Sequence, residues 1–281
     1  MSSAKTTTMP AAADADADTR PKILLHPVPI YDSPLAKGVS VGRVAVLLGL
    51  LAWGMDSLVA DPASALQRAL PVVAAVQAVY ATLCIPPAGS ASRAGKKPRP
   101  GEKTKKNDGS TSVISVRFSH THLYKPPPPP PYAALANLVP FLQSVIVALV
   151  LSALTVPALY ALLVLFGAPF LAHTAHTVLC AAHFALLAVF PVVHARGLDR
   201  SALVAVAGAA APLDEPYGAL VGAAAGAWLG AVPIPLDWDR DWQRWPVTVV
   251  VGAYVGAAAG SLLAGTVLYG KRLTGHAVKA D

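Results

Sequence analysis

Glycine recurs at every fourth position in two apolar segments near the end of the chain, and this spacing limits strongly how the chain can fold. Residues four apart lie on one face of a helix, so each segment would present a face without side chains, along which another backbone can approach closely. We interpret the pair as a transmembrane hairpin, a glycine zipper whose glycines serve helix packing. The glycines are Gly218, Gly222, Gly226 and Gly230 in the first segment and Gly252, Gly256 and Gly260 in the second.

The rest of the chain is also too apolar for a soluble protein. Hydrophobic residues make up 54% of the sequence and charged residues only 13%, against roughly 25% charged residues in an ordinary soluble domain. The charges lie in dense polar blocks separated by long uncharged stretches. The sequence therefore predicts an all-α, polytopic membrane protein with about six transmembrane helices.

The alternation of apolar and polar stretches divides the chain into five segments. We expect a disordered cytoplasmic arm at 1–40, helices 1 and 2 within 41–87, a disordered basic and proline-rich cytoplasmic linker at 88–132, helices 3 to 6 within 133–270, and a cytoplasmic tail at 271–281. The first four spans are expected at 44–60, 66–86, 135–166 and 170–194. Pro157 would kink the third, because proline cannot donate a helix hydrogen bond.

The positive charges set the orientation of these spans. All of the 22 lysines and arginines except Arg68, Arg240 and Arg244 fall in segments on the same side as the two termini. Because cytoplasmic loops are enriched in such residues, we expect cytoplasmic termini and a luminal turn at 237–245. The net charge of +7 follows from this topology, and we expect no nucleic-acid partner.

Three histidines and a cysteine occupy one face of the fourth span. His173, His176, Cys180 and His183 follow each other in steps of three, four and three residues. Such a face could bind zinc or iron, but membrane oxidases need further histidine boxes, and the other spans carry none. Histidines inside a helix bundle more often form hydrogen bonds between helices or meet a lipid headgroup. We therefore expect no metal and no cofactor.

Asp56 is an acidic residue inside an expected span. An intramembrane carboxylate is costly unless it finds a partner in the bundle, which makes Asp56 a candidate for a polar contact between helices. It also lies close to the end of its span. The alternative is that Asp56 caps the helix at the membrane interface.

The luminal turn alternates carboxylates with tryptophans. Its residues are Asp237, Trp238, Asp239, Arg240, Asp241, Trp242, Arg244 and Trp245. The carboxylates could bind a divalent ion or an ethanolamine-type amine, with the tryptophans as a cation-binding wall. The alternative is an aromatic belt at headgroup level whose charges pair with the two arginines. No catalytic triad, P-loop or dinucleotide motif accompanies the turn, so we do not expect an enzyme.

Several of these motifs together resemble the PIG-F family of glycosylphosphatidylinositol (GPI) anchor biosynthesis proteins. They are Phe166-Gly-Ala-Pro-Phe170, His173-Thr-Ala-His-Thr177, Pro191, the run from Pro235 to Pro246, and Gly252-Ala-Tyr-Val-Gly256. The resemblance covers roughly 41–270 and is most specific in the luminal turn. The positions that match its signature, and that we expect to contact a partner or lipid, are His173, His176, Thr177, Asp237, Trp238, Asp239, Arg240, Trp242, Trp245 and Pro246.

The resemblance implies a non-catalytic multi-pass subunit in the endoplasmic reticulum membrane. Its expected partners are the large catalytic ethanolamine-phosphate transferases, PIG-O and PIG-G, which transfer ethanolamine phosphate to mannoses of the GPI anchor. Membrane lipids, with the GPI precursor as a candidate, are the other expected partners. The alternative function is a membrane metalloenzyme or lipid transporter that uses the His173, His176 and His183 face and Asp56.

Overall fold

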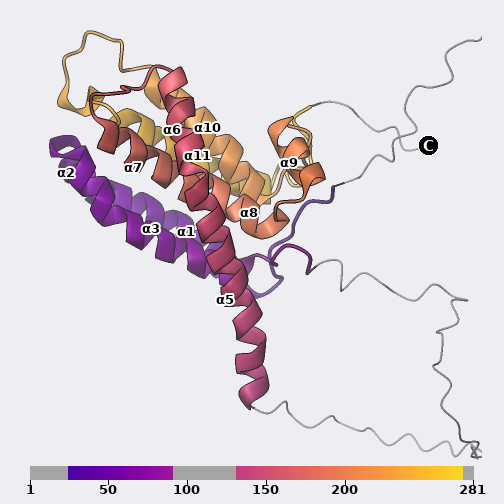
Figure 1. The fold of residues 1–281 in the computed structure, drawn as a ribbon. Coiled ribbons are helices and arrows are strands. Elements are labelled where there is room, and N and C mark those ends of the chain that lie inside the picture. Colours follow the sequence, from indigo (N-terminus) through magenta and orange to yellow (C-terminus); the bar gives the residue numbers. More distant parts are fainter. Residues whose placement is uncertain (1–24, 91–130, 275–281) are drawn as a thin grey trace, which may run out of the picture.

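The computed structural model describes residues 25–90 and 131–274, with side chains omitted for 131–140. In these ranges the chain folds into a bundle of helices, and a single isolated β-bridge joins Pro212 and Arg272. Figure 1 shows α5 crossing one side of the bundle and extending beyond it. The expected all-α architecture is confirmed. Most of the predicted arm and linker and part of the tail (1–24, 91–130 and 275–281) lie outside the described residues.

Among the described residues, five helical stretches are long and apolar enough to cross a membrane: Pro34–Trp53, Pro62–Cys84, Phe141–Leu165, Thr174–Arg196 and Val247–Gly265. The helices are α1 (Pro34–Trp53), α2 (Met55–Ala60), α3 (Pro62–Cys84), α5 (Pro131–Leu154), α6 (Val156–Leu165), α7 (Thr174–Phe184), α8 (Phe190–Arg196), α9 (Arg200–Ala207), α10 (Glu215–Ala231) and α11 (Val247–Gly265). A π-helical turn, Ala185–Val189, joins α7 to α8, and a 3-10 turn, Asp241–Gln243, precedes α11.

The fifth expected span corresponds to α10, which has 17 residues and is shorter than the other five. It lies antiparallel to α11 along nearly the whole of that helix, so the two helices extend over a similar length of the bundle. A Cβ atom built at Gly222 would overlap the carbonyl oxygen of Gly256, and one at Gly226 would overlap that of Gly252. The two backbones therefore touch directly, and any side chain at these positions would separate them.

The first helix begins ten residues before the expected start of the first span. Ser33 caps it, since the Ser33 hydroxyl accepts a 3.1 Å hydrogen bond from the Ala36 N–H, and Pro34 occupies the first turn. Proline suits this position because its missing N–H would have no helical partner there. Residues 34–40 are thus helical and do not belong to a disordered arm. The expected first span is also broken at Gly54, where α1 ends and α2 follows.

Two further spans are interrupted near prolines. The third span breaks at Thr155, two residues before Pro157, and continues as α6. The fourth widens into the π-helical turn just before Pro191. Pro191 has no N–H to donate to the carbonyl of Leu187, which leaves that carbonyl available to another donor.

The connecting segments gather at the two ends of the bundle, which we call the terminal end and the turn end. At the terminal end lie 25–33, 84–90, 194–214 and 266–274, tied together by backbone hydrogen bonds such as Tyr31 N to Cys84 O and Ala88 N to His194 O, both 2.9 Å. At the turn end lie 54–61, 166–173 and 232–246. Between them an apolar core is formed mainly by α1, α3, the π-helical turn and α11, including Leu47, Val73, Leu187, Val250 and Tyr254. Segments of the two ends alternate along the chain, as expected for helices that cross from one end of the bundle to the other and back.

Candidate functional site

The two segments that carry the family-like signature meet at the turn end. The indole N–H of Trp245 donates a 3.0 Å hydrogen bond to the hydroxyl of Thr177, which lies in the first turn of α7. Thr177 is buried, and its own hydroxyl lies 3.4 Å from the carbonyl oxygens of Pro169 and His173. The start of α7 and the turn before α11 therefore form one surface, although 68 residues separate them in sequence.

The side chain of Gln243 joins several backbone groups of the turn by hydrogen bonds. Its side-chain amide N–H groups donate to the carbonyls of Pro233 and Leu236 at 2.7 and 2.8 Å, and its amide oxygen accepts from the N–H of Arg240 at 2.9 Å. The side chain is buried, unlike most of its neighbours. Gln243 is not among the predicted site residues, because one amide in a polar run carries no signal of its own.

The other side chains of the turn face outward. Trp238 and Trp242 are 53% and 36% exposed, and their ring centroids lie 5.8 Å apart. Asp237, Asp239 and Arg240 are exposed, and Arg244 forms an exposed ion pair with Asp241. Within the described ranges no three acidic, histidine or cysteine side chains converge as metal ligands would. The geometry thus corresponds to an aromatic surface with charges around it.

Asp56 faces this surface from α2. It is exposed, and it lines an open depression of about 730 Å³ together with Arg240, Asp241, Trp242 and Arg244. This position at the end of the bundle corresponds to the interfacial alternative for Asp56. Nearby, the pKa of Asp61 lies below its usual value because the side-chain hydroxyl and backbone N–H of Ser64 donate to its carboxylate.

The histidines of the fourth span do not act together. His183 is buried, with Nε2 3.0 Å from the carbonyl oxygen of Leu66 and Nδ1 2.6 Å from the hydroxyl of Tyr254. Because a carbonyl only accepts, Nε2 carries the proton and Nδ1 accepts from Tyr254. His183 thus links α7 to α3 and α11, and neither nitrogen is available to a metal.

The remaining residues of this face lie apart from His183. His173 is exposed at the start of α7 with φ of 60°, and its ring packs edge-on against that of His176, with centroids 4.9 Å apart. Cys180 is a buried free thiol. The structure therefore brings His173, His176 and Thr177 to the turn-end surface, while Cys180 and His183 belong to the interior.

A second polar cluster, which was not predicted from the sequence, lies inside the bundle. The side-chain amide of Gln77 donates to the carbonyls of Leu186 and Leu187 at 2.8 and 3.4 Å, and so satisfies the carbonyl that Pro191 leaves without a donor. Its oxygen accepts from the guanidinium of Arg43 at 3.3 Å. Arg43 is only 5% exposed, and it also donates to the hydroxyl of Ser261.

Arg43 lies over the ring of Tyr80, 3.8 Å from its centroid. The hydroxyls of Tyr80 and Ser40 donate to one carboxylate oxygen of Glu215 at 2.8 and 2.7 Å. The cluster thus joins α1, α3, the π-helical turn, α10 and α11. Buried charges in a membrane protein are costly without partners, and here each charge has hydrogen bonds, which makes this a structural core.

A buried ion pair supports the terminal end of the bundle. Arg196 pairs with Asp214, whose carboxylate also accepts from the backbone N–H groups of Val28 and Tyr217 at 2.9 and 3.0 Å. Burial raises the pKa of Asp214 above its usual value, while Arg196 and the backbone donors oppose that shift. The pair fixes the start of α10 against the end of α8 and the segment before α1.

Comparison with known proteins places these features in a family. The profile of the GPI biosynthesis protein family Pig-F matches residues 43–265. The chain is 47% identical over 250 residues to glycosylphosphatidylinositol anchor biosynthesis protein 11 of Neurospora crassa, covering 88% of this chain and 81% of that protein. Its counterpart in Pyricularia oryzae is 44% identical, covering 85% and 78%, and that in Aspergillus fumigatus is 38% identical, covering 88% and 85%. No solved structure matches the chain.

Proposed function

The chain belongs to the PIG-F family of GPI biosynthesis proteins, and from this premise we propose that it is a non-catalytic subunit of an ethanolamine-phosphate transferase complex. In this role it binds and stabilises large catalytic subunits of the PIG-O and PIG-G type in the endoplasmic reticulum membrane. Its termini face the cytoplasm and its 232–246 turn faces the lumen, where those subunits would modify the mannoses of the GPI anchor.

The observation that carries the proposal is the contrast between two sets of glycines. The glycines of α10 and α11 lie between these two helices, because the faces that carry them pack against each other. Those of α1 are open: a Cβ atom built at Gly38, Gly42 or Gly49 would meet no atom within 4 Å. Together with Ala45 and Ala52 they form a face of small residues along α1, and such faces let transmembrane helices of another protein approach closely.

The surface at the turn end gives a second contact region on the proposed luminal side. Trp238 and Trp242 are exposed there, and tryptophan is enriched at the centres of protein interfaces and at the headgroup level of membranes. The alternative of a metal-dependent enzyme has less support, because both nitrogens of His183 are engaged in hydrogen bonds between helices.

The test is co-purification with the transferases from detergent extracts of membranes. A Cβ atom at Gly42 or Gly49 meets no atom of the chain within 4 Å. Leucine at both positions should therefore fill the open face of α1, and we expect at least a fivefold loss of bound transferase with normal accumulation of the variant itself. The matched control is Ala75→Leu, which adds similar bulk to an exposed position of α3. Undiminished co-purification of the double variant would count against α1 as the docking helix. Absence of any transferase from the unmodified protein's complexes would overturn the proposed function.

A further inference from the structure

A cavity of about 290 Å³ opens near the turn end, between α1, α2, α3 and α11. Its walls are mostly apolar and include Leu50, Leu58, Val72 and Val250. Its volume lies at the lower edge of the roughly 300–1,000 Å³ range of small-molecule pockets. Water gains little in such a space, because a buried water needs two to four polar partners. An apolar occupant suits it better.

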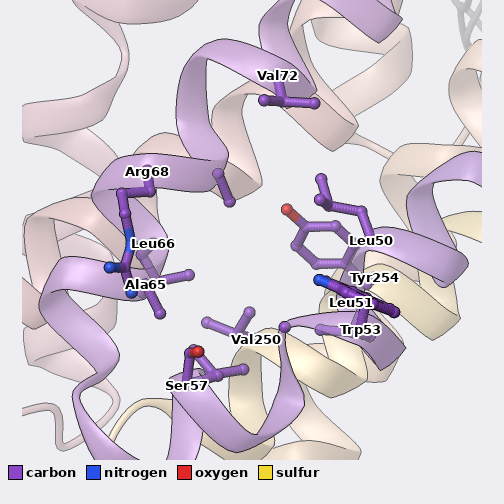
Figure 2. Close-up of a pocket in the computed structure, with 13 residues that line it drawn as sticks. Leu50, Leu51, Trp53, Ser57, Ala65, Leu66, Arg68, Val72, Val250 and Tyr254 are labelled. Atoms are coloured by element: carbon purple, nitrogen blue, oxygen red, sulfur yellow. The ribbon is translucent and has the colours of Figure 1, made fainter.

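Arg68 is the charged residue of this cavity. Figure 2 shows it on one side of the opening, across from Tyr254 and Trp53. Arg68 is exposed and has no hydrogen bond or ion pair with another described residue. It lies in the second turn of α3, about 9 Å along the axis from Pro62 at 1.5 Å per residue. Side chains on a helix tilt toward its N-terminus, which directs the guanidinium toward the turn end.

The charge and the apolar walls follow each other in the same order as the phosphate and the acyl chains of a membrane phospholipid. The cation lies toward the end of the bundle, while Leu50, Val72 and Tyr254 lie deeper along their helices. Trp53, 92% exposed beside the opening, is a residue typical of the membrane interface. An arginine fork binds phosphate oxygens in a bidentate manner. Charge, depth and wall chemistry together select one occupant.

We propose that this cavity holds one acyl chain of a glycerophospholipid whose phosphate is bound by Arg68. The buried hydroxyl of Tyr254 already donates a hydrogen bond to His183. It therefore does not require a polar ligand atom at the deep end of the cavity. The site is separate from the depression lined by Asp56 and Arg240, because α2 lies between the two. The proposal needs only a membrane location and does not depend on a transferase partner.

The acyl-chain part is tested with a phosphatidylethanolamine that carries a photoactivatable diazirine in one chain, on the full-length protein in nanodiscs. We expect crosslinks on the peptides that contain 50–58 and 65–72. Ala69→Phe fills the cavity from α3 and should lower this labelling at least fivefold, whereas Ala75→Phe, on the exposed face of the same helix, should leave it unchanged. Equal labelling of these peptides in both variants would overturn the cavity as the binding site.

The phosphate part is tested with Arg68→Gln, which changes an exposed side chain and should therefore leave the fold intact. Labelling by the phospholipid should fall about fivefold, the effect of losing a charge pair of roughly 1 kcal/mol, while labelling by a diazirine diacylglycerol without phosphate should not change. Arg200→Gln, which removes the same charge at the terminal end, is the control. A phospholipid signal that is insensitive to Arg68→Gln would overturn the role of Arg68. Transferase co-purification, measured on the same variants, reports separately on the proposed function.

Discussion

At the scale of single residues, Gln77 is the side chain on which the interior depends most directly. It donates to the Leu186 and Leu187 carbonyls beside Pro191 and accepts from Arg43. Gln77→Leu removes three hydrogen bonds, each worth roughly 0.6 kcal/mol in a membrane protein, so we expect the free energy of unfolding to fall by about 2 kcal/mol. Unfolding of the purified protein in detergent measures this loss.

The control for Gln77 comes from the same helix. Gln67 is an exposed glutamine of α3, and Gln67→Leu should leave the free energy of unfolding within about 0.5 kcal/mol of the unmodified protein. If the two variants were equally stable, the hydrogen bonds of Gln77 would contribute nothing to the fold.

Three charged residues show which features could not be predicted from the sequence. Asp56 stood out because it is a carboxylate in an apolar run, yet it lies exposed at the turn end. Arg43 lies just outside the expected first span, and Glu215 lies between the expected fourth span and the first glycine segment, yet each has partners in the interior. Sequence signals did exist, in the Ser33-Pro34 and Asp214-Glu215-Pro216 helix starts, which extend α1 and α10 to include both charges. Their partners, 34 to 218 residues away in the chain, have no local signature.

At the scale of elements, the contrast between two glycine faces gives the next prediction. An alanine methyl at Gly222 would overlap the backbone of α11, so α10 and α11 must move apart, which typically costs about 1–3 kcal/mol. At Gly42 the same methyl meets nothing within 4 Å, and alanine favours the helix over glycine by roughly 0.5–1 kcal/mol. In the same detergent unfolding assay, Gly222→Ala should therefore be destabilised and Gly42→Ala should be at least as stable as the unmodified protein. If Gly222→Ala were as stable as the unmodified protein, α10 and α11 would not pack through their glycines.

The helix order was more predictable than the helix irregularities. A four-residue glycine spacing depends only on the helix period, so the pairing of α10 with α11 could be expected from sequence. Pro157 also indicated that the third span would deviate from regular helix, whereas no deviation was predicted at Pro191. Whether a proline yields a break, as at Thr155, or a π-helical turn, as at 185–189, depends on donors from other helices. The Gln77 amide, which contacts the carbonyls of this turn, comes from α3.

At the scale of the whole molecule, the distribution of charge should fix how the bundle sits in the membrane. The expected luminal side carries only Arg68, Arg240 and Arg244 of the 22 lysines and arginines, and the structure places Arg240 and Arg244 in the turn before α11 and Arg68 near the turn-end start of α3. Excess positive charge remains on the cytoplasmic side of membranes. The terminal end is therefore the end that we expect to face the cytoplasm.

Cysteine labelling of sealed endoplasmic reticulum vesicles tests this orientation. The native Cys84 and Cys180 are buried thiols, so a membrane-impermeant maleimide should react with them slowly. Leu198→Cys, at an exposed position of the terminal end, should label in intact vesicles, because that end faces outward. Asp239→Cys, in the exposed turn, should label only after detergent opens the vesicles. The reverse pattern would place the Trp238 and Trp242 surface on the cytoplasmic side, where it could not contact a luminal catalytic domain.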